Sequence, residues 1–247
     1  MNRVKKRETP LSRMPARLDL AQSVSGLILG LFMWTHLLLV SSILLGKEAM
    51  HFVSKVMEMS FLSPSGEGYP VIVSLVGITI SALFIVHAAL AMRKFPSNWK
   101  QAATFREHMA MMRHPDTSHW WRQVITGFVM FFLGSVHLYV IITHPAEIGP
   151  FASSDRVYGF MWPLYLILLF AVEVHAAIGM YRLAVKWGVF DGADPRQSRK
   201  RLQIVERGLT MFFLSLGVAS LIAYMKIGYE HREHAGEPYV STEEASR

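Results

Sequence analysis

The stretch that decides the fold is residues 157–181, which read VYGFMWPLYLILLFAVEVHAAIGMY. Apart from Glu173, it contains no Asp, Glu, Lys or Arg. A helix needs about 20 apolar residues to cross the hydrocarbon core of a bilayer, so this stretch predicts a transmembrane helix. Four other stretches are similarly apolar and free of those charged residues: 20–46, 68–92, 123–146 and 208–225.

These five stretches predict the fold class. Backbone polar groups find no water in lipid, so only helices and closed barrels span it, and the stretches do not alternate in polarity as barrel strands do. The first stretch is too long for a signal peptide and lacks a small-residue cleavage motif. We therefore predict an all-α integral membrane protein with five transmembrane helices. We expect one transmembrane domain over 1–230, with an N-terminal arm, and a polar tail over 231–247.

The positive charge of the chain follows its expected topology. The net charge is +7, and 19 of the 25 Lys and Arg residues lie in three segments, 3–17, 93–122 and 182–207. Cytoplasmic loops of membrane proteins carry such an excess. We therefore place the N-terminus and the two basic loops in the cytoplasm, and residues 47–67 and the C-terminus outside. This distribution explains the charge without a nucleic-acid partner.

The histidines carry the strongest chemical signal. The chain has no cysteine, which excludes an iron–sulfur cluster, a disulfide and a covalently attached c-type haem. It has eleven histidines, of which seven lie in loops, at helix ends or in the tail, where solvated or interfacial side chains are expected. Four lie well inside expected spans, each on a different one: His36, His87, His137 and His175.

Depth along the helices groups these four into pairs. At 1.5 Å per residue, His87 and His175 lie about 10–15 Å from the inner boundary, and His36 and His137 lie about 20–25 Å from it. The surrounding sequences agree, since 86–92 reads VHAALAM and 174–180 reads VHAAIGM. His36 and His137 each follow a glycine by ten residues, and we expect these small residues to let a large flat macrocycle approach the backbone.

Two haems explain this arrangement better than zinc does. Four ligands at two depths cannot form one tetrahedral zinc site. Two haems, stacked inside the bundle of the first four helices and each held by two imidazoles, have no open coordination position, which favours electron transfer. Two other readings remain: a haem-free proton relay or transporter using Glu173 and the histidines, and an inert anchor whose histidines only join helices.

Several runs resemble a known family. SRMPARLD, AMRKFP, MRHPDTSHWW, GFVMFFLGSVHLYV, MWPLYLILLFAVEVH and YRLAVKWGVFDG closely resemble the di-haem cytochrome b membrane-anchor subunits of menaquinol:fumarate reductases and of two-haem, single-anchor succinate dehydrogenases. The resemblance covers roughly residues 12–192. The AMRKFP and WPLYLILLFAVEVH runs argue against a di-haem subunit of a hydrogenase or formate dehydrogenase.

The resemblance implies a respiratory complex in a bacterial inner membrane. It implies an iron–sulfur subunit and a flavoprotein subunit on the cytoplasmic side, with loop 93–122 as the docking segment, and menaquinol oxidation on the outer side. It also implies two haems b and suggests a dimer of heterotrimers. The direction, fumarate reduction or succinate oxidation, stays open.

The resemblance also assigns roles to single residues. It implies that His87 and His175 bind the inner haem and that His36 and His137 bind the outer haem. It matches Glu58, in VMEMS, to the quinol-site acid, whereas the sequence alone indicates a solvated loop acid. It implies that the haem propionates are held by Gln22, Ser23, Trp120, Arg156 and Lys186, although plain interfacial snorkelling also explains the last two.

Glu173 stands out because it lies inside a span. A charged group at mid-helix costs about 2.5–3.5 kcal/mol on insertion scales, so it usually marks a proton path or a specific partner. The resemblance implies a proton path through this acid that is coupled to haem reduction. The alternative is a neutral, hydrogen-bonded structural residue.

Overall fold

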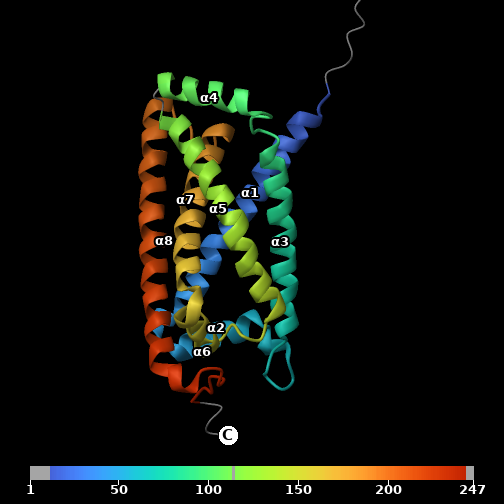
Figure 1. The fold of residues 1–247 in the computed structure, drawn as a ribbon, viewed down its shortest axis with the longest axis vertical. Coiled ribbons are helices and arrows are strands. Elements are labelled where there is room, and N and C mark those ends of the chain that lie inside the picture. The colour runs from blue at the N-terminus through green and yellow to red at the C-terminus, as the bar shows by residue number, and fades with distance from the viewer. Residues whose placement is uncertain (1–11, 113–114, 243–247) are drawn as a thin grey trace, which may run out of the picture.

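The computed structural model describes residues 12–112 and 115–242 of the chain. Within these ranges it contains helices and no strands. Five long helices run side by side (Figure 1), and each is long and apolar enough to cross a membrane. The predicted all-α fold with five transmembrane helices is therefore confirmed. The helices are α1 (Met14–Val40), α3 (Pro70–Met92), α5 (Pro115–Thr143), α7 (Trp162–Trp187) and α8 (Pro195–His231).

Short helices cover the two ends of this bundle (Figure 1). α4 (Trp99–Met112) crosses one end, which we call the α4 end, and α1 begins there. α2 (Lys47–Met57) and α6 (Pro150–Arg156) lie at the opposite, α2 end, where α8 finishes. The expected arm up to residue 11, His114 and the last five residues of the expected tail lie outside the described residues.

Turn chemistry defines where the helices begin and end. α3, α6 and α8 each begin with a proline, whose fixed φ and missing N–H suit the first helical position. Asp194 caps α8, because its side chain accepts from the backbone N–H of Arg196 at 2.9 Å and of Gln197 at 3.3 Å. Gly188 ends α7 at φ +61°, a conformation that favours glycine.

Helix α8 packs on the outside of the bundle, against α7, and reaches the end of α1. Close approach needs small residues, and a Cβ at Gly217 would lie 2.5 Å from Leu169 Cδ1. Tyr224 ties α8 to α1 because its hydroxyl donates to the Val40 carbonyl at 3.0 Å. The core at this end contains Ile43, Met50, Val157 and Tyr224.

Candidate functional site

The four intramembrane histidines meet in two pairs. The ring centroids of His36 and His137 lie 6.1 Å apart with an interplanar angle of 51°. Those of His87 and His175 lie 6.5 Å apart at 81°. The structure thus brings together the pairs that helix depth predicts, each formed by two different helices. We call them the outer pair and the inner pair, respectively.

The ring separations fit a metal held between two imidazoles. A metal–imidazole nitrogen bond is about 2.0–2.1 Å long, and the ring centre lies about 1.1–1.2 Å beyond the nitrogen, so two opposed ligands would place their ring centroids about 6.4 Å apart. Both observed separations lie within a few tenths of an ångström of this value. The residues therefore fit haem, whose macrocycle supplies the other ligands.

Hydrogen bonding at the ring nitrogens indicates which nitrogen could bind a metal. His175 Nδ1 lies 2.9 Å from the Gln123 carbonyl oxygen, which can only accept, so Nδ1 carries the proton. Nε2 is then the nitrogen with a lone pair for a metal. In the outer pair, His137 Nδ1 is buried and has no hydrogen-bond partner among the described residues, while its ring contacts Tyr165 at 5.5 Å.

The glycines near the ligands do not lie where the sequence suggested. Gly26 and Gly127 precede His36 and His137 by ten residues, but they face the other pair. A Cβ at Gly26 would lie 2.8 Å from His87 Cε1, and one at Gly127 would lie 3.1 Å from His175 Cε1. The reason is geometric, since ten residues advance a helix by about 15 Å, which carries it from the outer level to the inner one.

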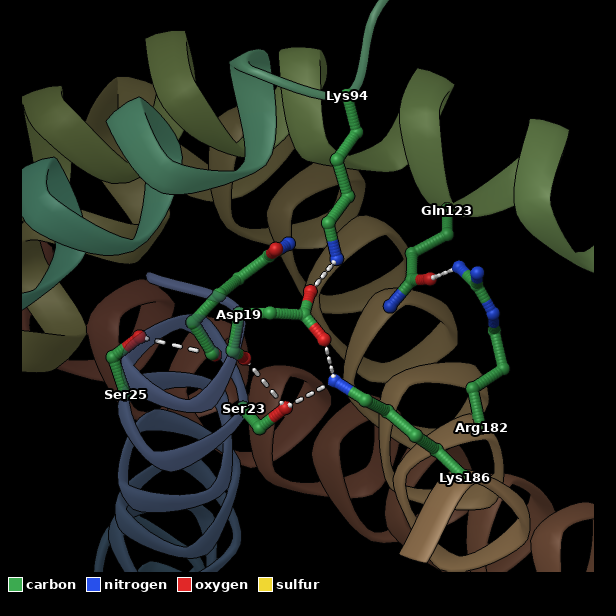
Figure 2. A network of polar contacts seen from close by, with 8 residues as sticks. Asp19, Ser23, Ser25, Lys94, Gln123, Arg182 and Lys186 are labelled. Atoms are coloured by element: carbon green, nitrogen blue, oxygen red, sulfur yellow. Dashed lines mark hydrogen bonds and ion pairs between the residues drawn. The ribbon is translucent and has the colours of Figure 1, made fainter. Parts of the chain in front are cut away.

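A charge cluster joins three helices at the α4 end (Figure 2). The Asp19 carboxylate of α1 forms ion pairs with Lys94, just after α3, and with Lys186 of α7. Lys186 also donates to Ser23 Oγ at 3.0 Å. Sequence reasoning selected Ser23 and Lys186 but missed Asp19 and Lys94, because each lies directly outside an apolar stretch and reads as part of a charged loop.

The other residues expected at this end are nearby but form different contacts. Gln22 Oε1 is buried without a hydrogen-bond partner among the described residues. Trp120 packs on Phe105 of α4 at 4.8 Å between ring centroids. It shares a cavity of about 290 Å³ with Lys94, the partner of Asp19. The structure therefore places Trp120 beside the charge cluster, and no polar contact of its indole is described.

Arg156 lies at the α2 end and is linked to the outer pair. Its guanidinium donates to the Glu147 carbonyl at 2.7 Å and lies 3.5 Å from the Glu147 carboxylate. It also lies close enough to Tyr165 to interact with its hydroxyl electrostatically, and the Tyr165 ring contacts His137. Tyr165 was missed because an aromatic residue inside an apolar span carries no distinguishing signal.

Glu173 is fully buried, and one of its oxygens is satisfied. Trp34 of α1 donates from Nε1 to Glu173 Oε2 at 3.1 Å, and Oε1 has no partner among the described residues. Trp34 in turn stacks on Phe213 of α8, with centroids 5.4 Å apart and planes 3° apart. Trp34 was missed, although a mid-span tryptophan away from the interfacial belt is a signal that could have found it.

Glu58 ends α2 and is only 6% exposed. Its carboxylate lies 3.7 Å from Lys55 Nζ, and its carbonyl accepts from the Tyr69 N–H at 2.7 Å. Gly68, at φ +87°, packs so closely that a Cβ there would lie 2.8 Å from Glu58 Cβ. Burial raises the pKa of the Glu58 carboxyl above its ordinary value, and Lys55 partly opposes this. The solvated loop acid expected from sequence alone is therefore wrong, since the loop after α2 folds over the side chain.

Comparison with known proteins agrees with this geometry. Residues 98–218 match the family described as succinate dehydrogenase/fumarate reductase transmembrane subunit. The fumarate reductase cytochrome b subunit of Wolinella succinogenes is 51% identical over 92% of this chain and 88% of that protein. The subunits of the same name from two Helicobacter pylori strains are 48% and 47% identical over 89% of this chain and 84% of each. The chain therefore belongs to the succinate dehydrogenase/fumarate reductase family of transmembrane subunits, among the fumarate reductase cytochrome b subunits.

Proposed function

We propose that this chain anchors a fumarate reductase in the membrane and conducts electrons through it, from menaquinol near the α2 end to an iron–sulfur subunit at the α4 end. The observation that carries the proposal is the distance between the two ring centroids within each histidine pair, 6.1 Å and 6.5 Å, which leaves room for one metal between the two imidazoles. Haem b, when bound at each pair, supplies a one-electron carrier with no open coordination position.

The polypeptide's part is to hold these groups and to balance their charge. His87 and His175 would bind the inner haem, and His36 and His137 the outer one. Lys186, Ser23, Gln22 and Trp120 lie at the α4 end, where they would hold the inner propionates. Lys186 shares the Asp19 carboxylate with Lys94, so two lysines and one carboxylate give the cluster a net positive charge there. Arg156 would serve the outer haem, and its link to His137 through Tyr165 supports this.

The proposed orientation places the α4 end in the cytoplasm. The basic segments 93–122 and 182–207 flank this end, as the excess of Lys and Arg in cytoplasmic loops predicts. The iron–sulfur and flavoprotein subunits that a fumarate reductase requires would dock here. Dicarboxylate chemistry then belongs to the flavoprotein, and this chain contributes the quinol side of the reaction.

Glu58 is the proposed base for quinol oxidation. A base must accept a proton from a quinol hydroxyl as electrons leave, and it works best with a pKa near the working pH. Burial moves the pKa of Glu58 in that direction. Its place at the α2 end, on the same side of the bundle as the outer histidine pair, supports this role.

Glu173 is the proposed acid of a proton path. An electron that moves inward across a dry bilayer charges a medium of low dielectric, and a proton moving the same way cancels that cost. The side chain is fully buried and holds one oxygen free of described partners, which leaves that oxygen available to exchange a proton.

The test is the haem content of single histidine variants. Purified complex should give two haems b per chain in a pyridine haemochrome spectrum, and His→Ala at any of the four positions should remove at least one. His108→Ala is the matched control, because His108 is exposed on α4. Retention of two haems in all four variants would contradict the ligand assignment. Assays of fumarate reduction and succinate oxidation on the same preparation measure the preferred direction.

A further inference from the structure

Two segments of the bundle share a short pattern that the function so far leaves unexplained. Residues 22–26 of α1 read QSVSG, and residues 123–127 of α5 read QVITG. Both follow the pattern Gln-x-x-Ser/Thr-Gly. In both, the glycine lies ten residues before a histidine of the outer pair. We call them the α1 box and the α5 box. Each lies against one histidine of the inner pair, on the neighbouring helix.

The α1 box surrounds the ring of His87. Ser25 Oγ lies 3.0 Å from His87 Nδ1. The Ser25 hydroxyl donates to the Gln22 carbonyl at 3.1 Å, so its oxygen is free to accept from Nδ1–H. Gly26 leaves room for the ring edge, since a Cβ there would lie 2.8 Å from His87 Cε1.

The α5 box repeats these contacts on His175. The Gln123 carbonyl lies 2.9 Å from His175 Nδ1, and Thr126 Oγ1 lies 3.4 Å from it. Thr126 Oγ1 also donates toward the Gln123 carbonyl at 3.2 Å. A Cβ at Gly127 would lie 3.1 Å from His175 Cε1. The hydroxyl is therefore the Nδ1 partner in the α1 box, and the carbonyl is the closer of two Nδ1 partners in the α5 box.

These contacts fix both the proton and the plane of each ring. Acceptors at Nδ1 keep the proton there and turn Nε2 toward the partner ring, and such outer-shell acceptors raise the basicity of a metal-bound imidazole. The glycine fixes the position of the ring edge. The same set is not repeated at the outer level, where His137 Nδ1 has no partner among the described residues.

We propose that the α1 box and the α5 box are the positioning elements of the inner pair, and that their acceptors make the reduction potential of the inner haem lower than it would be without them. The inference rests on the proposed haem function. A more basic axial imidazole stabilises ferric iron over ferrous iron, so loss of an acceptor raises the potential. The boxes act through His87 and His175 and do not touch the iron.

The hydroxyl variants give the most direct test. Ser25→Ala and Thr126→Val should retain two haems per chain, and redox titration should show one of the two haem potentials shifted upward. The shift should be larger for Ser25→Ala, because Ser25 lies closer to its histidine. Ser25→Thr should restore the parental potential. Ser81→Ala is the control, since the one bond of the Ser81 hydroxyl within the described ranges goes to the Gly77 carbonyl of its own helix at 2.8 Å.

The glycine variants test the positioning of the rings. Gly26→Ala should lower haem content from two to one, and Gly127→Ala should do so less completely because its clash is milder. Gly134→Ala on α5 is the control, as its nearest contact would be an ordinary 3.9 Å. Where haem is retained, the low-spin ferric EPR signal should change for the inner haem, because its anisotropy follows the angle between the imidazole planes.

The outcomes separate this inference from the proposed function. Unchanged potentials in both hydroxyl variants, or equal shifts of both haems, overturn the role of the boxes while leaving the histidines as ligands. Equal haem loss in Gly26→Ala and Gly134→Ala overturns it as well. If a glycine variant does not accumulate, the hydroxyl variants decide. Parental complex without haem overturns the proposed function itself.

Discussion

Removing the positive charge of Lys55 should move the acid side of the quinol-oxidation pH profile to higher pH. If Glu58 is the base, activity falls at low pH as its carboxylate becomes protonated. Burial already raises the pKa of this carboxyl, and Lys55 opposes the rise by favouring the charged form. Lys55→Met keeps the aliphatic length and deletes the charge, so the carboxylate becomes less stable and protonation occurs at higher pH.

The size of the shift follows from the distance. At the 3.7 Å between Lys55 Nζ and Glu58 Oε2, Coulomb's law in bulk water gives about 1.1 kcal/mol, or about 0.8 pKa unit. Exposed ion pairs measure about 0.2–1 kcal/mol because solvent screens them. The Lys55 side chain is 29% exposed, so screening applies here. We therefore expect a shift of about half a pH unit.

The assay is menaquinol-dependent fumarate reduction by purified complex across a pH series, with an artificial donor to the partner subunits as reference. Glu58→Gln should abolish the quinol reaction and preserve the artificial one, which assigns the base. Lys226→Met is the control, because Lys226 pairs with Glu230 and is 75% exposed. Added salt should shrink the shift in Lys55→Met. An unchanged or downward shift, or quinol activity in Glu58→Gln, would refute the reasoning.

Two further substitutions test the bundle. Trp34→Phe should reduce quinol-driven turnover several-fold while both haems are retained, because Glu173 loses its indole donor. Haem spectra and turnover are measured on one preparation. Unchanged turnover would contradict this expectation. Gly228→Ala should lower the thermal midpoint of the solubilised chain, because a Cβ there collides with the Ser154 carbonyl. Gly208→Ala, on the same helix with open space around it, should be neutral or stabilising by up to about 1 kcal/mol; equal effects of the two would contradict the packing.

The lengths of the apolar stretches and the depths of the histidines along the helices predicted much of this fold, because both can be counted along the chain. A stretch of apolar residues is long enough to span or it is not, and each of the five predicted spans overlaps one of the five long helices, with ends that differ by up to a few residues. Depth requires only the rise per residue, so the level of each histidine could be counted from a boundary. This is why the pairing of His36 with His137 and of His87 with His175 was within reach of the sequence.

Neighbours across helices could not be predicted, because they depend on rotation and crossing. Gly26 was noted for its spacing from His36, but its contact is with His87 on the neighbouring helix. Asp19 looked like one more charge in a basic arm, although it pairs with two lysines from other helices. Glu58 looked solvated because its burial comes from a loop twelve residues long that folds back to Tyr69. No pattern of spacing encodes such contacts.

Glu173 and His175 lie two residues apart on α7 but make contacts with different parts of the bundle. Residues two apart on a helix do not share a face. His175 accordingly meets His87 and the α5 box, whereas Glu173 meets Trp34, which stacks on Phe213 of α8. In the proposed function the electron therefore follows the histidine pairs inside the first four long helices, and the proton follows a separate face shared by α1, α7 and α8. Helix α8 contributes none of the four histidines, and in this proposal it would line the proton path through Phe213.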